Sequence, residues 1–315
     1  MTYFSNNDYE IRIQDYRDDS YIALGSGDYC SVKFDGVGSP DLRDSVYDVS
    51  GADGVIFGTE YYGMVNWTIT GAVHSGINGG VAGDSGAAWD AWSTLSRVWT
   101  QYPERLIPRA VKPLFFKRPG REQMVVYGRP ARIDPETERS HAGFIAYTAT
   151  FRQSDPLFYS SQQQMVQLGM DVPYAGGILL NAPKNALRLP FVTTEGAAKN
   201  ALLNNTGDVP TSPIITFIGP VENPELTLTD QFSIRHWYVK INGTIPAGTS
   251  IIVDTRQWAR SVTDSYGTSW AGAYVGDKLQ DVKIPVGINT IGYQGIDQTG
   301  TSLCRVEFRN AWASL

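Results

Sequence analysis

The sequence lacks a long hydrophobic run. No segment approaches the roughly 20 consecutive apolar residues that a helix needs to cross a bilayer. The N-terminal residues MTYFSNNDYEIRIQD also lack the basic start and the apolar stretch of a signal peptide. We therefore expect a protein that is synthesised and folded in a cytoplasm and has no membrane partner.

Metal-ligating side chains are few and scattered. The chain has only two cysteines and three histidines, which are Cys30, Cys304, His74, His141 and His236. They show no HxH, HExxH or CxxC spacing, and both cysteines alternate with apolar residues, which predicts small core side chains. The acidic segments Asp15 to Asp19 and Asp41 to Asp53 lack the ligand order of a calcium loop, so we expect solvated carboxylates there. No metal and no cofactor is predicted.

Charged residues make up only 18% of the chain. The 32 acidic and 26 basic side chains give a formal net charge of −6, and no GxxxxGK[ST] loop occurs. This balance does not favour a surface that binds nucleic acid.

Turn residues and apolar residues are abundant instead. The chain has 32 Gly, 17 Pro, 42% apolar and 12% aromatic residues, which is too apolar for disorder and too rich in turns for a helical bundle. A mainly β protein is therefore expected, and the 315 residues suggest two domains.

Short alternating runs separated by turn clusters predict strands in the first half. These runs are YIAL (21–24), YCSVKF (29–34), GVIFG (54–58), MVNWTIT (64–70), a pair joined by a turn at Pro119-Gly120, and GFIAYTATFR (143–152). We expect a sheet.

One helix is predicted at AAWDAWSTLSRVWTQY (87–102). Its apolar side chains recur at spacings of four and three and share one face, formed by Ala88, Trp92, Leu95, Trp99 and Tyr102. Asp84 or Ser85 supplies the N-cap oxygen, and Pro103 ends the helix. The glycine-dense stretch before it (74–86) is expected to be a flexible surface loop.

The C-terminal part predicts an antiparallel β-sandwich. Strands are expected at SIRHWYVKI (233–241), SIIVDT (250–255), NTIGYQGI (289–296) and SLCRVEFR (302–309), with turns between them. The polar tract SSQQQ (160–164) and the Pro- and Gly-rich segment 173–194 mark the entry into this unit. We therefore place the domains at 1–157 and 158–315.

The segment Gly83-Asp84-Ser85-Gly86 matches the string around the nucleophile of chymotrypsin-like proteases, which suggests a catalytic interpretation. His74 lies eleven residues before Ser85. In those proteases the base and the nucleophile are far apart in sequence, and here a helix starts directly after Ser85, so capping of the helix is favoured.

Glycan chemistry stays open. A glycosidase needs two carboxylates facing each other across a cleft, and a β-sandwich can hold such a pair. A sugar-stacking platform could be formed by Trp237, Trp258, Trp270 and Trp312. Tryptophans in a sandwich are more often core or interface residues.

Several strings resemble the distal tail proteins of siphophages, the phages with long non-contractile tails. In the first half these are DLRDSVYDVSGADGVIFGTEYYG (41–63) and TFRQSDPLFYS (150–160). The second half adds NTGDVPTSPIITFIGPVENPELTL (205–228), INGTIPAGTSIIVDTRQW (241–258), IPVGINTIGYQG (284–295) and TGTSLCRVEFRNAWASL (299–315). The resemblance is strongest to versions from phages of actinobacteria, and 18 Arg against 8 Lys suits a GC-rich genome.

The resemblance implies a β-rich α+β protein. A tail-tube-like ring (belt) domain with one helix would precede a galectin-like antiparallel β-sandwich. It implies a structural virion component at the tail tip, not an enzyme, in which six copies form a ring that joins the tail-tube protein to the tail-tip hub. DNA would pass through the lumen without specific binding, and the net acidic charge is compatible with this. A carbohydrate-binding tail adhesin is the alternative.

Overall fold

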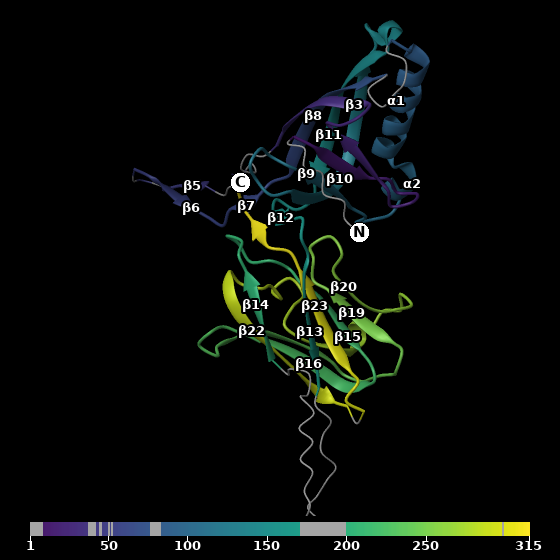
Figure 1. The fold of residues 1–315 in the computed structure, drawn as a ribbon. Helices are drawn as coiled ribbons and strands as arrows, with labels where there is room; N and C mark the ends of the chain where they lie inside the picture. The colour runs from purple at the N-terminus through teal and green to yellow at the C-terminus, as the bar shows by residue number, and fades with distance from the viewer. Residues whose placement is uncertain are drawn as a thin grey trace, which may run out of the picture. The chain divides into compact units, whose positions relative to one another are not determined.

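Figure 1 shows a computed structural model of the chain, which describes residues 9–36, 42–43, 46–49, 51, 53–75, 83–170, 200–297 and 299–315. The segment 173–194 and most of the glycine-dense loop before the helix lie outside these residues. The chain forms two compact units: unit 1 contains Met1–Gln162 together with Ala311–Leu315, and unit 2 contains Gln163–Asn310. The domain boundary between residues 157 and 158 stays a prediction.

Unit 1 is built on one antiparallel sheet with the strand order β2-β1-β9-β10-β11-β8-β3; β12 pairs with β10, and β24 with β12. These strands are β1 (Ile11–Gln14), β2 (Tyr21–Leu24), β3 (Tyr29–Asp35), β8 (Val65–His74), β9 (Lys112–Phe116), β10 (Met124–Glu136), β11 (Phe144–Gln153), β12 (Phe158–Ser160) and β24 (Ala311–Trp312). Every second side chain of β11 is buried, as expected for a strand with one face on a core. The predicted strands of the first half are confirmed.

Helix α1 (Ser85–Thr100) begins at an Asp84 cap. The Asp84 Oδ1 atom accepts hydrogen bonds from the backbone N–H groups of Gly86 (2.8 Å) and Ala87 (3.2 Å), which confirms the capping interpretation. The predicted end at Pro103 is wrong. Gln101 adopts the left-handed conformation (φ 42°) and ends α1, and Pro103 lies inside the short helix α2 (Tyr102–Arg105) that follows. A 3-10 turn, η1 (Ser140–Ala142), lies before β11.

The apolar face of α1 packs on the sheet. Its buried side chains are Ala88, Trp92, Leu95, Val98 and Trp99, and they belong to one core with strands β1, β8, β9, β10 and β11. The Trp99 indole N–H donates to the Arg132 carbonyl oxygen (3.1 Å). The predicted stripe is thus confirmed for Ala88, Trp92, Leu95 and Trp99, whereas the side chain of Tyr102 lies outside the described residues.

An aromatic cluster forms the centre of this core. Trp67, Phe116 and Phe158 are fully buried, and the rings of Trp67 and Phe116 lie 4.8 Å apart between centroids. The Trp67 indole N–H donates to the Gln153 side-chain oxygen (2.8 Å), and the Gln153 amide nitrogen donates to the carbonyl oxygens of Asp155 and Leu157. The buried Gln153 amide is therefore satisfied at both its oxygen and its nitrogen, which avoids the cost of an unpaired polar group.

The C-terminal residues belong to unit 1. Phe158 of β12 pairs with Trp312 of β24, and Tyr159 pairs with Ala311. Ala311 is fully buried, and Trp312 and Leu315 pack against the core of unit 1. The sheet of unit 1 therefore contains strands from both ends of the described chain.

Unit 2 is a β-sandwich of two antiparallel sheets, with the orders β13-β23-β15-β19-β20 and β14-β22-β16-β17-β21, and with β18 beside β16. The strands are β13 (Gln164–Gly169), β14 (Asn200–Asn205), β15 (Ile214–Ile218), β16 (Val221–Thr229), β17 (Arg235–Ile241), β18 (Thr244–Ile245), β19 (Ser250–Asp254), β20 (Ser261–Asp264), β21 (Tyr274–Gly276), β22 (Gly287–Ile296) and β23 (Leu303–Phe308); a 3-10 turn, η2 (Ala271–Ala273), precedes β21. Alternating side chains of both sheets meet in one core. The predicted mainly β fold with antiparallel sheets is confirmed.

The turn between β22 and β23 is held by Asp297. This carboxylate is buried and accepts hydrogen bonds from the backbone N–H groups of Thr299 (2.8 Å) and Ser302 (2.7 Å) and from the Thr299 hydroxyl (2.7 Å). Burial by itself raises the pKa of Asp297, but the hydrogen bonds from Thr299 and Ser302 outweigh it and lower the pKa to about 2.

Because the folded-state pKa lies below the unfolded value of about 3.9, the charged form of Asp297 stabilises the fold above pH ~4, and this stability is lost as the pH falls to about 2. We expect Asp297→Ala to reduce the free energy of unfolding at pH 7 and to flatten its fall between pH 4 and 2. Denaturant titrations across that range measure this. The exposed Asp281, changed to Ala, is the control. Parallel pH profiles for Asp297→Ala and wild type would contradict the expectation.

Candidate assembly surface

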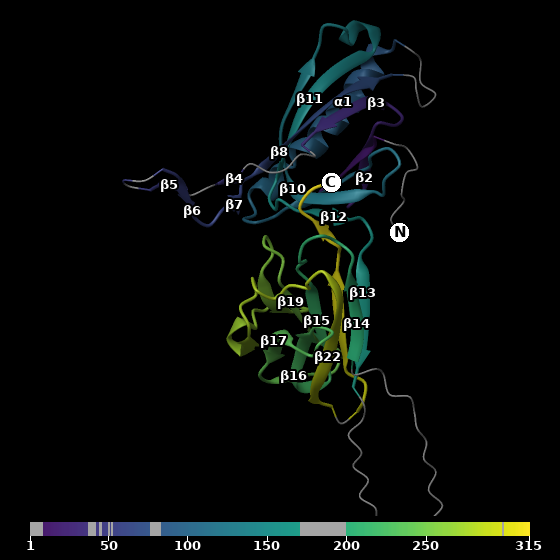
Figure 2. The same cartoon turned by 90° about the vertical axis from the view of Figure 1, so that its left-hand side faces the viewer.

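A two-stranded arm extends from one edge of the unit 1 sheet. Beyond the β3–β8 pair, β4 (Leu42–Arg43) pairs with β7 (Tyr61–Tyr62), and β5 (Val46–Asp48) pairs with β6 (Val55–Phe57). The register is almost constant along this length, from Asp35 opposite Thr68 to Asp48 opposite Val55. We call residues 42–62 the arm; Figure 2 shows it projecting away from the sheet.

The tip of the arm is a glycine turn. The Val49 backbone N–H donates to the Gly54 carbonyl oxygen (3.2 Å), and Gly51 and Gly54 both have positive φ angles, of 81° and 118°. Residues other than glycine rarely adopt these φ angles, so the two glycines allow the chain to reverse direction here.

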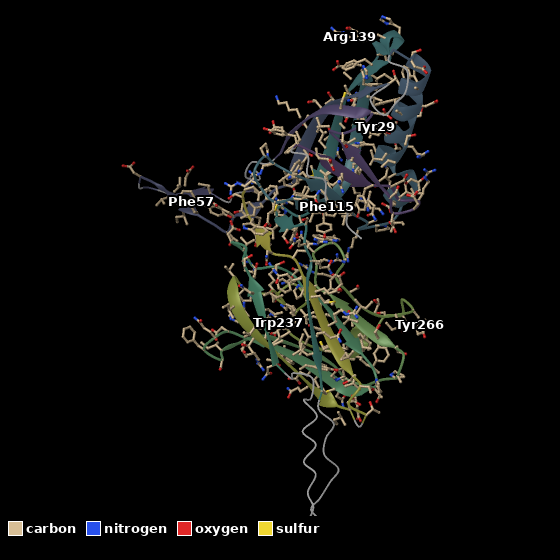
Figure 3. All side chains as sticks on the ribbon, in the orientation of Figure 1. Tyr29, Phe57, Phe115, Arg139, Trp237 and Tyr266 are labelled. Carbon is tan, nitrogen blue, oxygen red and sulfur yellow. The ribbon has the colours of Figure 1, made fainter. Side chains whose placement is uncertain are left out.

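Both faces of the arm carry exposed apolar side chains. Val46 lies opposite Phe57 on one face, and Tyr47 lies opposite Ile56 on the other. Phe57 is 69% exposed and Ile56 is 59% exposed; Figure 3 labels Phe57 on the arm. Nearer the sheet, Tyr61 and Tyr62 are also exposed.

An isolated two-stranded arm with exposed apolar side chains is unfavourable in water. A two-stranded ribbon without a second layer is at best marginally stable, and its unpaired edges can pair with other chains. Exposed apolar patches usually mark surfaces that bind another protein. The arm therefore has the properties of a surface that binds another protein chain.

The sequence indicates this surface by apolar residues at successive positions of a strand, and not by the alternation of apolar and polar residues. The strings VIF (55–57) and YY (61–62) place apolar residues at successive positions, and successive side chains of a strand point to opposite faces. An apolar pair or triplet in a short strand therefore predicts two apolar faces.

The protease-like string does not form a hydrogen-bonded pair in the described part of the chain. His74 ends β8, and its Nδ1 atom is buried without a hydrogen-bond partner. Ser85 is the first residue of α1, directly after its Asp84 cap.

The four tryptophans of the sugar-platform interpretation do not share one face. Trp237 is buried in the core of unit 2, where its indole N–H donates to the Lys283 carbonyl oxygen (2.7 Å), and Trp270 packs against the same core. Trp312 packs in unit 1. Trp258 lies under the Arg256 guanidinium, 5.7 Å from the ring centroid.

The remaining candidates are structural. Cys304 is buried, as predicted, and burial raises the pKa of its thiol; Cys30 is only half-buried on β3, so its predicted core position is partly met. Asp15 corrects the expectation of solvated carboxylates, because it is buried beside the guanidinium groups of Arg17 and Arg97, at 3.3 and 3.8 Å.

The described residues contain no group of three or more His, Cys, Asp or Glu side chains that could hold a metal ion. Among the helices that the structure describes, none is long and apolar enough to cross a membrane.

Unit 2 presents a smaller exposed apolar turn between β16 and β17. The Asp230 Oδ1 atom accepts hydrogen bonds from the backbone N–H groups of Phe232 (2.8 Å) and Ile234 (2.9 Å). These bonds fix the turn, and both apolar side chains are exposed.

Together these features define a class of protein: a mainly antiparallel β protein in which a sheet unit with one packed helix and an apolar arm is combined with a β-sandwich. Solved structures that share this fold include two phage proteins. The Dit protein of phage SPP1, described as a paradigm of the hub adsorption apparatus in phages that infect Gram-positive bacteria, matches with a TM-score of 0.53 and 15% identity over 89% of this chain and 91% of that chain. A chain of the phage p2 baseplate in its activated conformation with Sr matches with a TM-score of 0.50 and 11% identity over 96% and 98% of the two chains.

The chain therefore has the fold of a phage distal tail protein, which confirms the β-rich fold that the sequence resemblance implied, whereas the galectin-like topology of the sandwich stays a prediction. A scan against protein-family models and a search of the curated proteins each give no match. The assignment to phages of actinobacteria stays a prediction.

Proposed function

We propose that the protein is a structural component of a phage tail tip, in which six copies form a ring between the tail tube and the tail-tip hub. The observation that carries this proposal is the arm, whose apolar faces need protein partners, on a chain with the fold of a phage Dit protein. The tail-tube protein would bind one side of the ring and the hub protein the other. The proposed location is the virion.

A ring requires two different contact surfaces on each copy. Such heterologous contacts close into a ring when the rotation between neighbours is a whole fraction of a turn, and otherwise form open filaments. The arm supplies one of these two surfaces. In a heterologous contact it binds a different surface of the next copy, and not that copy's arm. The ring surrounds a lumen for DNA, and a net charge of −6 limits phosphate binding there.

We propose a galectin-like topology and no catalytic role for the sandwich of unit 2. The adhesin alternative needs an aromatic platform with convergent polar groups. Trp237, Trp270 and Trp312 instead pack against cores, which favours the structural role.

The purified protein is expected to form closed six-membered rings, because association of copies removes the exposed apolar side chains of the arm from water. Negative-stain electron microscopy would show the rings, and light scattering after gel filtration would give six times the monomer mass. A different symmetry, or a monomer at every concentration tested, would exclude the proposed ring.

A further inference from the structure

We propose that the arm of one copy binds the loop between α2 and β9 of the next copy. This inference rests on the proposed ring and adds the surface on which the arm is seated. We call residues 105–112, with the sequence RLIPRAVK, the acceptor loop.

The acceptor loop exposes two adjacent apolar side chains. Leu106 is 69% exposed and Ile107 is 56% exposed, which matches the exposure of Ile56 and Phe57 on the arm. Adjacent exposed apolar residues on a loop are unfavourable in water unless a partner covers them.

Two arginines fix the loop on β10, one by binding the loop backbone and one by binding the backbone of β10. The Arg129 guanidinium on β10 donates to the carbonyl oxygens of Ala110 and Ile107. The Arg105 guanidinium donates to the carbonyl oxygens of Pro130 and Ala131, both at 3.0 Å. A loop fixed in this way loses little conformational freedom when a partner binds, so its apolar side chains form a preorganised surface.

The charges of the two surfaces are complementary. The arm contains four acidic residues and one basic residue, a net charge of −3, and the described acidic residues Asp48, Asp53 and Glu60 are exposed. The acceptor loop contains three basic residues and no acidic residue, a net charge of +3. Lys112 is compensated by Glu104, at 2.9 Å, and by Asp19, at 3.8 Å, whereas Arg109 is exposed on the loop. Opposite charges around apolar centres steer association and exclude partners of the wrong sign.

The two surfaces lie on different sides of unit 1. The arm continues the β3–β8 edge of the sheet, whereas the acceptor loop leads into β9, which lies on the other side of β10 and β11 in the strand order. In Figure 1 the arm and α2 point to opposite sides of unit 1. An arm cannot bind its own acceptor loop in this arrangement, so the contact must be made between copies, head to tail.

The test uses two variants of the full chain that each lose one surface. The arm variant carries Ile56→Asp and Phe57→Asp, and the loop variant carries Leu106→Asp and Ile107→Asp. Each alone should remain a monomer, because it lacks one half of every contact. An equimolar mixture should form 1:1 dimers and nothing larger, since only the intact arm of the loop variant and the intact loop of the arm variant can meet.

All four substituted side chains are exposed, so both variants should keep the circular dichroism spectrum of wild type, and their thermal midpoints as monomers should equal each other. Tyr266→Asp is the matched control, because Tyr266 is an exposed aromatic residue in unit 2 (Figure 3), and this variant should form normal rings. A second pair of variants tests charge: Asp48→Arg with Asp53→Arg should weaken the ring at least tenfold, and adding Arg109→Glu to the same chain should recover part of that loss. Recovery by a third substitution cannot come from misfolding.

The outcomes separate this inference from the proposed ring. Rings formed by the arm variant would show that the ring closes without the apolar arm, and would overturn the inference while the ring stands. Normal rings of the loop variant, with monomers of the arm variant, would place the arm on a different surface and also overturn it. A monomeric wild type would overturn the proposed ring and the inference together.

Discussion

Replacement of Trp92 by alanine is expected to destabilise unit 1 by about 3–5 kcal/mol. Trp92 lies on the buried face of α1, and its ring is 6.3 Å from that of Tyr147 on β11. Alanine would leave a cavity between the helix and the sheet that the surrounding strands cannot fill. Denaturant unfolding followed by tryptophan fluorescence measures the loss.

Trp89 offers a control on the same helix. It lies three residues earlier and is 37% exposed, so Trp89→Ala should cost much less. The comparison holds residue type and helix constant and varies burial. If Trp92→Ala unfolded at the same denaturant concentration as wild type, the helix would not be packed on the sheet, and its face would have to be covered by another copy.

Replacement of Gly128 by alanine is expected to destabilise unit 1 by about 3 kcal/mol, which is the upper end of the usual cost of adding atoms to a packed core. Gly128 lies in β10 and pairs with Lys112 of β9 on one side and Gln153 of β11 on the other. A Cβ atom there would lie 2.1 Å from the Arg152 carbonyl oxygen and 2.7 Å from the Phe151 ring. Because both neighbours are held in the sheet, the strands would have to separate.

Gly272 is the matched control, since a Cβ atom there meets nothing within 4 Å. Gly272→Ala should leave the thermal midpoint within a degree or two of wild type, by the usual small effect of surface substitutions. Equal midpoints for both glycine variants would mean that β10 and β11 are less closely paired than the structure shows.

The strands and α1 could be predicted because local patterns determine them. Buried and more exposed side chains alternate along all of β11, and the buried side chains of α1 recur with a helical period. The sequence of each element therefore predicts which of its faces is buried. Asp84 was predictable as a cap because its chemistry acts within three residues. The end of α1 was not, because the left-handed Gln101 is also held by a bond from its side-chain amide to the distant Gln14 carbonyl oxygen (2.9 Å).

Features that depend on contacts between residues far apart in the sequence could not be predicted. The two residues of β24 have no period of their own, and nothing near Ala311 shows that β12 is its partner. Asp15 was expected in solvent because the nearby sequence is acidic, whereas one of its partners, Arg97, comes from α1. For the arm, the sequence predicted a strand at 54–58 and a family resemblance, but exposure depends on which surfaces the rest of unit 1 leaves uncovered.

The place of β24 in unit 1 has a consequence for biosynthesis. Residues 163–310 separate the last strand of unit 1 from β12, its partner in the sheet. A ribosome must therefore translate all of unit 2 before the nascent chain can fill the final position of the first sheet. While that position is empty, the buried side of β12 lacks Ala311 and Trp312. Each nascent chain thus carries an unfinished first unit until Ala311 and Trp312 have been translated.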